Sequence, residues 1–394
     1  MDIDRIREAM DSIDKTFIKA LFTANYYRAY KALEEYVLEV IFRVLHEMNI
    51  TDYLQKDYRT VDEIVDRFNF HAQSKPLLNW MLTYLNQMGY LQNGDLCYLL
   101  KADPSDMHTK NSVSEIAALM PTANIFIQLA RHVERGIKDF LMGRKNGRDI
   151  LISNNTVSAL WNDYFNNNFY GYSTLNYCTA YGMTKWFSQT EGKSMLEVGS
   201  GTCGATIKVF QMLRDNNLLD SMDSIVLSDI VPSLLDLGSR NISRSITSPP
   251  RYEQRLLDIS LSLREQGFLK DSIDIVYGVN VFHVANDLSF SLREVYDHLN
   301  KNGLLILTET IRPVENRALH HEIIFDLFDN YYNVKLDAIM RPYHGFLTKE
   351  RWVKYFEMAG FKNIEDISEL NRHEELDFDI LPLHSVLVLK GQKC

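Results

Sequence analysis

Residues 193–206 read KSMLEVGSGTCGAT, and this stretch decides the fold that we expect for the chain. Its first half has the apolar pattern of a short buried strand, glycines follow, and the next residues have the pattern of a helix. Glycine has no Cβ, so the backbone can turn sharply here and a ligand can lie against it. Glu197 stands at the carboxyl end of the strand, where open α/β sheets bind their ligands. The glycine pattern alone is a weak signal, because dinucleotide oxidoreductases share it.

The composition is that of a globular protein with an acidic balance. The 394 residues are 46% hydrophobic and 24% charged, which suggests two or three domains with a large core. The net charge is −10 and no long basic run occurs. This balance argues against nucleic acid as the main partner.

Cysteine usage and apolar patterning favour a cytoplasmic protein without a membrane segment. The four cysteines lie far apart with no zinc-binding or disulfide spacing, at positions 97, 178, 203 and 394. The first residues, MDIDRIREAMDSID, are charged and helical in pattern and lack the apolar core of a signal peptide. No apolar run reaches about 18 residues, so we expect no membrane span.

The first 105 residues begin with helical patterns. Apolar residues recur at three- and four-residue steps over 12–48. Thr60 and, three residues later, Glu63 form a capping box that begins the next helix. A further helix is expected over 74–88, with its leucines on one face.

A hairpin then completes a winged-helix pattern, with Asn93 and Gly94 as its expected turn. Winged helices often bind DNA, but the helix over 74–88 has one lysine and no arginine, whereas a groove-reading helix usually carries basic side chains. A DNA-binding regulator is therefore disfavoured. The long aromatic-rich first helix suits a dimer contact instead, and we expect residues 1–105 to form the dimerisation domain of a homodimer.

Residues 106–185 are expected to form a helical connector. Its second half contains TVSALWNDYFNNNFYGYSTLNYCTAYG, which is crowded with asparagine and tyrosine. Such side chains could line a substrate pocket, with Tyr164 as the candidate contact. For most of them, packing against the following domain is the simpler interpretation.

Strand patterns alternate with helical patterns over 186–394. This alternation predicts an α/β domain with a Rossmann-like, doubly wound sheet of seven strands, mainly parallel. No helical pattern separates the sixth strand from the last, so the last is expected to run antiparallel. The expected strands are 194–198, 224–229, 252–257, 273–279, 303–309, 361–367 and 384–391.

Polar side chains follow the first four of these strands, at the edge where such a sheet builds its site. Asp229 ends the second strand, where a carboxylate can accept hydrogen bonds from both ribose hydroxyls of a nucleoside. Asp258 ends the third strand, where its side chain can accept from the amino group of an adenine. Asn280 and His283 follow the fourth. Each acid alone is more often a cap or a surface group, but the ordered set favours a nucleoside site.

His283 and Glu309 follow neighbouring strands of the expected sheet. A carboxylate beside an imidazole fixes its tautomer and raises its basicity, which makes a general base. Two alternatives stay open. His283 could merely stand at the start of a helix, and Glu309 could pair with Arg312.

Residues 193–312 resemble class I S-adenosylmethionine-dependent methyltransferases, and most of all the methyltransferase domains of polyketide synthases. LEVGSGTCGAT resembles their first motif and LSDIVPSLL the ribose motif. LLDIS, IDIVYGVNVFHVANDL and LLILTE resemble the adenine, catalytic and closing-strand motifs, in unbroken order. The similarity continues through TETIRP and RPYHGFLTKERW to FEMAGF. The amino-terminal region resembles instead the dimerisation domain of small-molecule O-methyltransferases.

This resemblance implies S-adenosyl-L-methionine as the cofactor, His283 as the catalytic base and Glu309 as the acid that orients it. Cys203 departs from the pattern, because the family often has glycine there. The residues implied to bind the cofactor are Glu197, Gly199 and Gly201 at its methionine part, Asp229 at the ribose, Asp258 and Ile259 at the adenine, and Asn280 near its amino group. Ile230, next to Asp229, is also expected to bind the cofactor.

The methyl acceptor is expected to be a small molecule or a carrier-bound acyl or keto intermediate of secondary metabolism. The catalytic half favours methylation of a carbon flanked by carbonyls, whereas the amino-terminal half favours a hydroxyl acceptor. Arg341 and His344 are the first candidates for contacting an acidic or carbonyl substrate, unless they are surface loop residues.

Two further alternatives concern metal and redox chemistry. Metal-assisted methylation of an α-keto acid would draw ligands from His283, Glu309, His320, His321 and His344. No tight ligand spacing supports it, so no metal site is predicted. An NAD-dependent oxidoreductase would share the glycine loop and Asp229, but it does not explain Asp258 together with Asn280 and His283.

Overall fold

The computed structural model describes residues 24–94, 97–101, 112–166, 170–187, 193–367 and 386–394. The chain divides into two compact units. One unit holds Asn162–Pro313 and Val334–Cys394, and the other holds Thr23–Trp161 and Val314–Asn333.

The first unit is built on a seven-stranded sheet in the order β5-β4-β3-β6-β7-β9-β8. Parallel pairing joins β5, β4, β3, β6 and β7, and β9 runs antiparallel to both of its neighbours. The predicted doubly wound sheet and the antiparallel last strand are confirmed. The strands are β3 (Ser194–Val198), β4 (Ser224–Asp229), β5 (Glu253–Leu256), β6 (Ile273–Val279), β7 (Leu299–Thr310), β8 (Lys362–Asp366) and β9 (Val386–Gln392).

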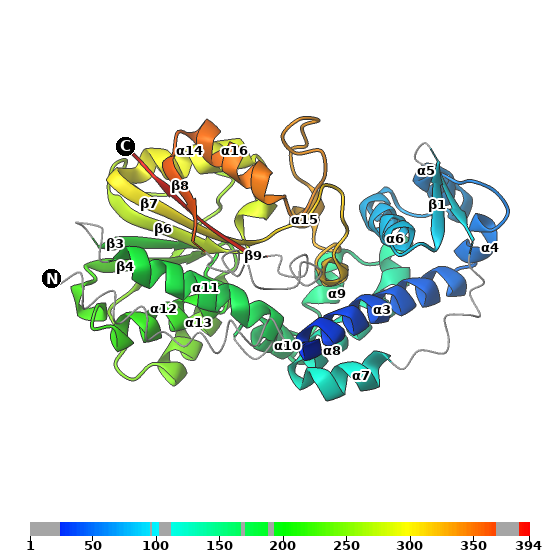
Figure 1. Ribbon diagram of the computed structural model, residues 1–394, viewed down its shortest axis with the longest axis horizontal. Helices are drawn as coiled ribbons and strands as arrows, with labels where there is room; N and C mark the ends of the chain where they lie inside the picture. Colours follow the sequence, from blue (N-terminus) through cyan, green and yellow to red (C-terminus); the bar gives the residue numbers. More distant parts are fainter. Residues whose placement is uncertain (1–23, 95–96, 102–111, 167–169, 188–192, 368–385) are drawn as a thin grey trace. The chain divides into compact units, whose positions relative to one another are not determined.

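Helices cover both faces of this sheet (Figure 1). On one face lie α11 (Tyr170–Phe187), α12 (Gly204–Asp215) and α13 (Pro232–Ser245), and on the other lie α14 (Leu288–His298) and α16 (Lys349–Ala359). Central strand residues such as Leu196 and Leu305 share one buried cluster with Trp352 of α16. Because both faces are covered, the strands read as near-continuous apolar runs.

The second unit is mainly helical. Its capping box is present as expected, since Thr60 Oγ1 accepts from the Glu63 amide and Glu63 Oε2 accepts from the Thr60 amide. The elements are α3 (Ala24–Glu47), α4 (Ile50–Leu54), α5 (Val61–Phe68), α6 (Lys75–Gln87), β1 (Leu91–Gly94), β2 (Cys97–Leu100), α7 (Ser112–Leu119), α8 (Asn124–Leu141), α9 (Gly147–Leu151), most of α10 (Asn155–Phe165) and α15 (Asp329–Tyr332). Five 3₁₀ turns complete the described chain: η1 (Ala72–Ser74), η3 (Pro121–Ala123), η4 (Leu219–Ser221), η5 (Phe282–Val284) and η6 (His320–Ile324).

The apolar face of α3 is buried against other helices of its own unit. Tyr36, Val37, Ile41 and Leu45 are each at most 2% exposed, and α3 packs on α4, α6, α7 and α8. The pattern that suggested a dimer contact is therefore satisfied within the chain and does not by itself require a second copy. The earlier part of the helix expected over 12–48 lies outside the described residues.

The expected Asn93-Gly94 turn is wrong. Both residues belong to β1, where Gly94 pairs with Cys97. The buried pair of Leu91 and Leu100 favours this register, because a slip of either strand by one residue would turn the leucine of that strand outward. The link between the two strands lies outside the described residues.

Segment 314–333, which follows β7, belongs to the helical unit rather than to the sheet. Trp80 Nε1 donates to Glu322 Oε2 at 3.1 Å, and the Ala318 amide donates to Gln87 Oε1 at 3.0 Å. From the sequence we expect this segment within the domain over 186–394. Its contacts with α6 join residues more than 200 positions apart, and hydrophobic periodicity does not reveal such contacts.

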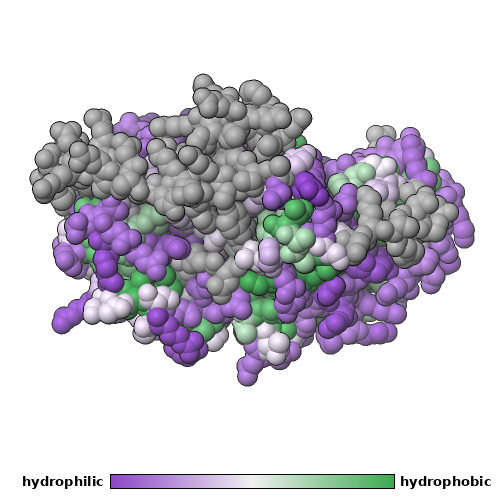
Figure 2. Space-filling model, turned by 60° about the horizontal axis from the view of Figure 1, so that its bottom comes forward, coloured by the Kyte–Doolittle hydropathy of each residue, from purple (hydrophilic) through white to green (hydrophobic). Residues whose placement is uncertain are grey.

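On the face that Figure 2 presents, the described residues are mainly hydrophilic, with separate apolar patches between them. Among the described residues, no helix combines the length and apolar character needed to cross a bilayer.

Candidate active site

Strand order brings the predicted polar residues to one edge of the sheet. β4, β3, β6 and β7 are consecutive neighbours, so the residues after Val198, Asp229, Val279 and Thr308 meet at the carboxyl edge. The chain order reverses between β3 and β6, which is where open α/β sheets form their binding crevice.

The loop after β3 needs its glycines for two different reasons. Gly199 has φ +65°, and a Cβ there would collide with Val281. Gly201 has φ +51°, but a Cβ there would meet nothing nearer than 4.0 Å. Backbone conformation therefore selects Gly201, and the space above it is open to a ligand.

Glu197 is buried beneath this loop, at 1% exposure. Its Oε2 accepts hydrogen bonds from the hydroxyls of Thr206 and Tyr277, the latter at 3.0 Å. Burial raises the pKa of the Glu197 carboxyl to about 7, against the lowering effect of those two hydroxyls. The two partners were not singled out from the sequence, although Thr206 lies in the quoted loop.

Asp229 ends β4 and faces the same loop. Its Oδ2 accepts from the Gly201 amide at 2.9 Å and its Oδ1 from the Val231 amide at 2.8 Å. Burial raises the pKa of this carboxyl, and the backbone amides partly offset the effect. The next residue, Ile230, is 60% exposed, so an apolar side chain stands open beside a buried carboxylate.

The loop after β5 carries Asp258 and Ile259. Asp258 Oδ1 accepts from the Ser260 amide at 2.8 Å, and its own amide donates to Gln266 Oε1 at 2.7 Å. The carbonyl of Ile259 accepts from Ser291 Oγ at 2.8 Å. The two residues thus stand on a loop with a fixed backbone.

Asn280 follows β6 directly and adopts the left-handed region, with φ +55°. Its amide donates to the Thr308 carbonyl at 2.7 Å, and its Oδ1 accepts from the Thr310 amide at 3.1 Å. Asparagine tolerates this conformation better than most residues. The turn directs the following residues across the end of β7.

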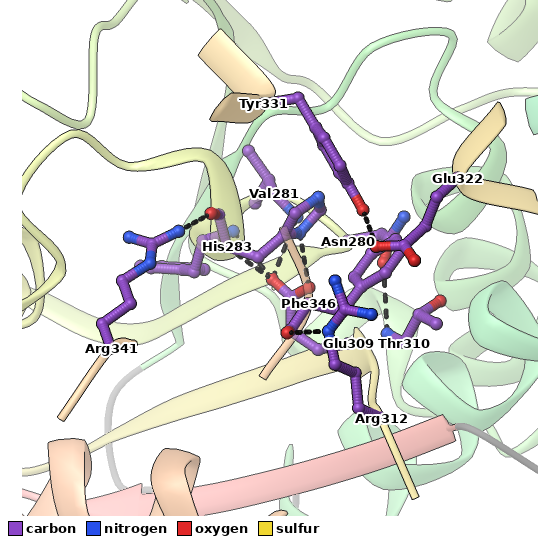
Figure 3. Close-up of polar contacts among 11 residues, drawn as sticks. Asn280, Val281, His283, Glu309, Thr310, Arg312, Glu322, Tyr331, Arg341 and Phe346 are labelled. Carbon is purple, nitrogen blue, oxygen red and sulfur yellow. Dashed lines mark hydrogen bonds and ion pairs between the residues drawn. The ribbon is translucent and has the colours of Figure 1, made fainter. Parts of the chain in front are cut away.

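His283 and Glu309 form a buried pair, as the sequence predicted from their neighbouring strands (Figure 3). The His283 Nδ1–Glu309 Oε2 distance is 2.7 Å. Glu309 Oε1 also accepts from three consecutive amides, those of Val281, Phe282 and His283, at 3.1, 2.7 and 3.3 Å. One carboxylate therefore holds both the ring and the backbone of the loop.

Arg312, the alternative partner considered for Glu309, donates to backbone carbonyls. Its Nε–O distance to Phe346 is 2.8 Å, and its Nη2–O distance to His344 is 3.3 Å. The Phe346 ring in turn lies 4.5 Å from the His283 ring, centroid to centroid, at 41°. Phe346 was missed from the sequence, since only the fold brings residue 346 against residue 283.

The three candidate substrate residues lie in different surroundings. Arg341 is 1% exposed and donates to the carbonyl of His283 (Figure 3) and to that of Ala285. His344 is half-buried. Tyr164 is buried against Phe165 and Tyr172, and burial raises the pKa of its hydroxyl. Their predicted contacts with a substrate stay predictions.

Cys203 adopts φ +61°, which explains why glycine suits this position. The thiol lies beside Gly238 of α13, where a Cβ would collide with the sulfur. The missing side chain at 238 therefore makes room for the extra one at 203.

Among the described residues, no group of three or more His, Cys, Asp or Glu side chains could hold a metal ion. His320 and His321 are neighbours in the helical unit, with perpendicular rings 5.1 Å apart.

Known proteins that resemble the chain are polyketide synthases and methyltransferases. No protein-family model matches it. The highly reducing polyketide synthase easB of Emericella nidulans is 25% identical over 229 residues, 58% of this chain and 8% of that protein. Probable polyketide synthase 42 of Dictyostelium discoideum is 28% identical over 192 residues, 47% of this chain and 7% of that protein. The chain thus spans less than a tenth of the length of these two relatives.

Two solved structures share the architecture. The CurJ carbon methyltransferase superposes with a TM-score of 0.79 at 18% identity, covering 99% of each chain. The trans-methyltransferase CalH in complex with SAH gives 0.62 at 17% identity, covering 93% of this chain and 92% of that one. The chain therefore has the fold of methyltransferase domains, as the sequence resemblance predicted.

Proposed function

We propose that this chain, whose fold is that of the methyltransferase domains, is an S-adenosylmethionine-dependent methyltransferase with His283 as general base. The observation that carries the proposal is the buried His283–Glu309 pair, with 2.7 Å between Nδ1 and Oε2. His283 lies on the loop after β6, and Glu309 lies near the carboxyl end of β7. β6 is the direct neighbour of β3, whose loop carries the glycines.

The residues at this edge fit the cofactor. Bound S-adenosylmethionine would supply a sulfonium-activated methyl group. Gly201 offers an open backbone, and the buried Asp229 carboxylate would accept from the ribose hydroxyls. The exposed Ile230 side chain would give the adenosine an apolar contact. The proposed cofactor-binding set remains Glu197, Gly199, Gly201, Asp229, Ile230, Asp258, Ile259 and Asn280.

Glu309 sets the protonation of the base. A carboxylate oxygen at Nδ1 keeps the proton of the neutral imidazole on that nitrogen, so Nε2 carries the lone pair. For a carbon between two carbonyls, His283 takes the C–H proton and the electron pair passes into the enolate. For a hydroxyl, it takes the O–H proton.

We favour carbon as the methylated atom, because the relatives reported above are polyketide synthases and the similar CurJ structure is a carbon methyltransferase. The proposed acceptor is a β-keto acyl group, either in a small molecule or bound to a carrier. O-methylation by the same pair is the alternative.

Other parts of the proposal rest on sequence. We retain a dimerisation domain over 1–105, a connector over 106–185 and a catalytic domain over 186–394, with segment 314–333 of the last range packed in the helical unit. A homodimer is supported by the resemblance of the amino-terminal region to dimerisation domains. A cytoplasmic location is supported by the spacing of the cysteines.

The proposal is tested by following a labelled methyl group. Each incubation contains the chain, ¹³C-methyl S-adenosylmethionine and one acceptor. The acceptors are an N-acetylcysteamine thioester of 3-oxobutanoate, a phenol and an α-keto acid, and each is tested with and without chelator. Carbon NMR should show the label on C2 of the thioester. Label on the phenol oxygen identifies the alternative, and loss of α-keto acid methylation with chelator identifies metal assistance.

A matched variant shows that turnover belongs to the proposed site. His283→Ala should transfer no label while it still binds S-adenosylhomocysteine. If the wild-type chain binds NAD but not S-adenosylhomocysteine in a thermal-shift assay, the methyltransferase proposal is wrong.

A further inference from the structure

Segment 335–341, which precedes α16, is bonded to the residues that follow His283. The Lys335 amide donates to the Asn286 carbonyl at 2.7 Å. Lys335 Nζ pairs with Asp287 Oδ2 at 2.7 Å. Segment 335–341 thus contacts the loop that carries the proposed base at more than one point.

A tight turn closes this segment. The amides of Asp337 and Arg341 donate to each other's carbonyls at 2.9 and 2.8 Å. Asp337 Oδ1 accepts from the amides of Ile339 and Met340 at 2.9 and 2.6 Å. The turn leaves Ile339 75% exposed, whereas Arg341 is only 1% exposed.

Arg341 points from this turn to the backbone of the loop (Figure 3). Its Nη2 donates to the His283 carbonyl, and its Nη1 donates to the Ala285 carbonyl at 3.1 Å. A planar guanidinium can bridge two carbonyls in this way, which the single ammonium of lysine does not reproduce.

The loop is therefore held by two side chains of opposite charge. Glu309 accepts from the amides of residues 281–283, and Arg341 donates to the carbonyls of residues 283 and 285. The loop forms only a short 3₁₀ turn of its own, Phe282–Val284, so these charged side chains supply much of its fixation.

We propose that Arg341 is a positioning residue for the reaction, and that it fixes the direction of the His283 ring through the His283 backbone. This rests on the proposed function of His283. It replaces the expectation that Arg341 contacts the substrate, because its guanidinium is buried on the main chain. A misplacement of a base by about 1 Å can cost on the order of 100-fold in rate, so the effect belongs in kcat rather than in KM.

Two variants grade the effect. Arg341→Lys keeps the charge but can bridge only poorly, and Arg341→Met removes the hydrogen bonds and keeps much of the volume. We expect kcat with the 3-oxobutanoate thioester to fall about 10-fold for lysine and about 100-fold for methionine. KM should change less than about threefold, and the Kd of S-adenosylhomocysteine less than about twofold.

Amide hydrogen exchange measures how firmly the loop is held, and it does not depend on turnover. Peptides that cover 280–286 should exchange at least about tenfold faster in Arg341→Met, while peptides that cover the glycine loop stay unchanged. If the wild-type chain transfers no methyl group, the proposed function fails, and the exchange result still decides whether Arg341 fixes the loop.

Arg293→Met is the matched control. Arg293 is an exposed residue of α14, with its Cζ 5.6 Å from the Tyr296 ring centroid, and its loss should alter neither kcat nor exchange. A rise in KM at unchanged kcat in Arg341→Met would make Arg341 a substrate contact. Unchanged kcat and exchange would remove any role in positioning, and failure of both Arg341 variants to fold would reduce Arg341 to a stability role.

Discussion

Glu309 binds His283 twice, once through the ring and once through the backbone. Oε2 lies 2.7 Å from the imidazole Nδ1, and Oε1 lies 3.3 Å from the amide nitrogen of the same residue. The carboxylate is fully buried, so its interactions are not screened by water. The base and the loop that carries it are thus fixed by one side chain.

Loss of the imidazole should remove turnover and spare cofactor binding. General-base catalysis contributes about 100- to 10,000-fold, so kcat of His283→Ala should fall by at least about 100-fold. Calorimetry should give a Kd for S-adenosylhomocysteine within about twofold of the wild-type value. An affinity loss as large as that of Asp229→Ala would contradict the assigned role.

Replacement of Glu309 by glutamine should harm both stability and rate. The amide group brings N–H donors to a place that already holds three backbone N–H donors and the imidazole Nδ1. A buried group left without a partner costs about 1–3 kcal/mol, which chemical denaturation can measure. Stability equal to wild type would show that the loop does not depend on the carboxylate.

Asp229 should govern cofactor affinity rather than the chemical step. Hydrogen bonds to a charged group contribute about 1.5–3 kcal/mol, so Asp229→Ala should weaken S-adenosylhomocysteine binding by about 10- to 100-fold. Asp236→Asn, on the exposed side of α13, is the control and should bind normally. Equal losses in the two variants would indicate a general charge effect.

Glu197 should make the stability of the ligand-free chain depend on pH. Its folded pKa of about 7 lies above its ordinary value of 4.5, so the folded state binds this proton more tightly. The corresponding stabilisation is full below about pH 4.5 and is lost as pH rises through 7, by about 3 kcal/mol in all.

A neutral variant isolates the Glu197 carboxyl from the other groups that lie near it. Asp229 lies near Glu197 and also has a raised pKa, and Cys203, Thr206 and Tyr277 face the same carboxyl. Glu197→Gln should gain about 3 kcal/mol in unfolding free energy relative to wild type between pH 4.5 and pH 8. Parallel pH profiles for the two proteins would contradict a titrating Glu197.

Cys203 and Gly238 should be energetically coupled. Gly238→Ala brings a Cβ against the Cys203 sulfur, so it should destabilise the wild-type chain by about 1–3 kcal/mol. In a Cys203→Gly background the same change removes a helix glycine without that collision, and only the contact of the Cβ with the Gly201 carbonyl oxygen at 3.1 Å remains, so it should cost less. A double-mutant cycle by denaturation should give a coupling of about 1 kcal/mol or more, and additivity would show that the sulfur can move aside.

Local sequence patterns were sufficient to predict the sheet and the polar residues at the ends of its strands. The glycine loop follows β3, Asp229 ends β4 and the sequence NVFH follows β6, and the apolar runs of these strands are visible in the sequence. Strand neighbours then place His283 beside Glu309. The hairpin turn failed, because the buried register of Leu91 and Leu100 outweighs the turn preference of Asn-Gly.

The amino-acid sequence by itself determined the order of strands and helices, the glycine loop and the acid, amide and imidazole positions at the carboxyl edge, since these depend on short-range periodicity and backbone preference. Only the tertiary structure decided what surrounds the base. Arg341 and Phe346 lie more than 50 residues from His283, and their contacts arise from packing of loops that carry no periodic signal. The same holds for segment 314–333, which leaves the sheet to pack on α6 because its polar partners are there.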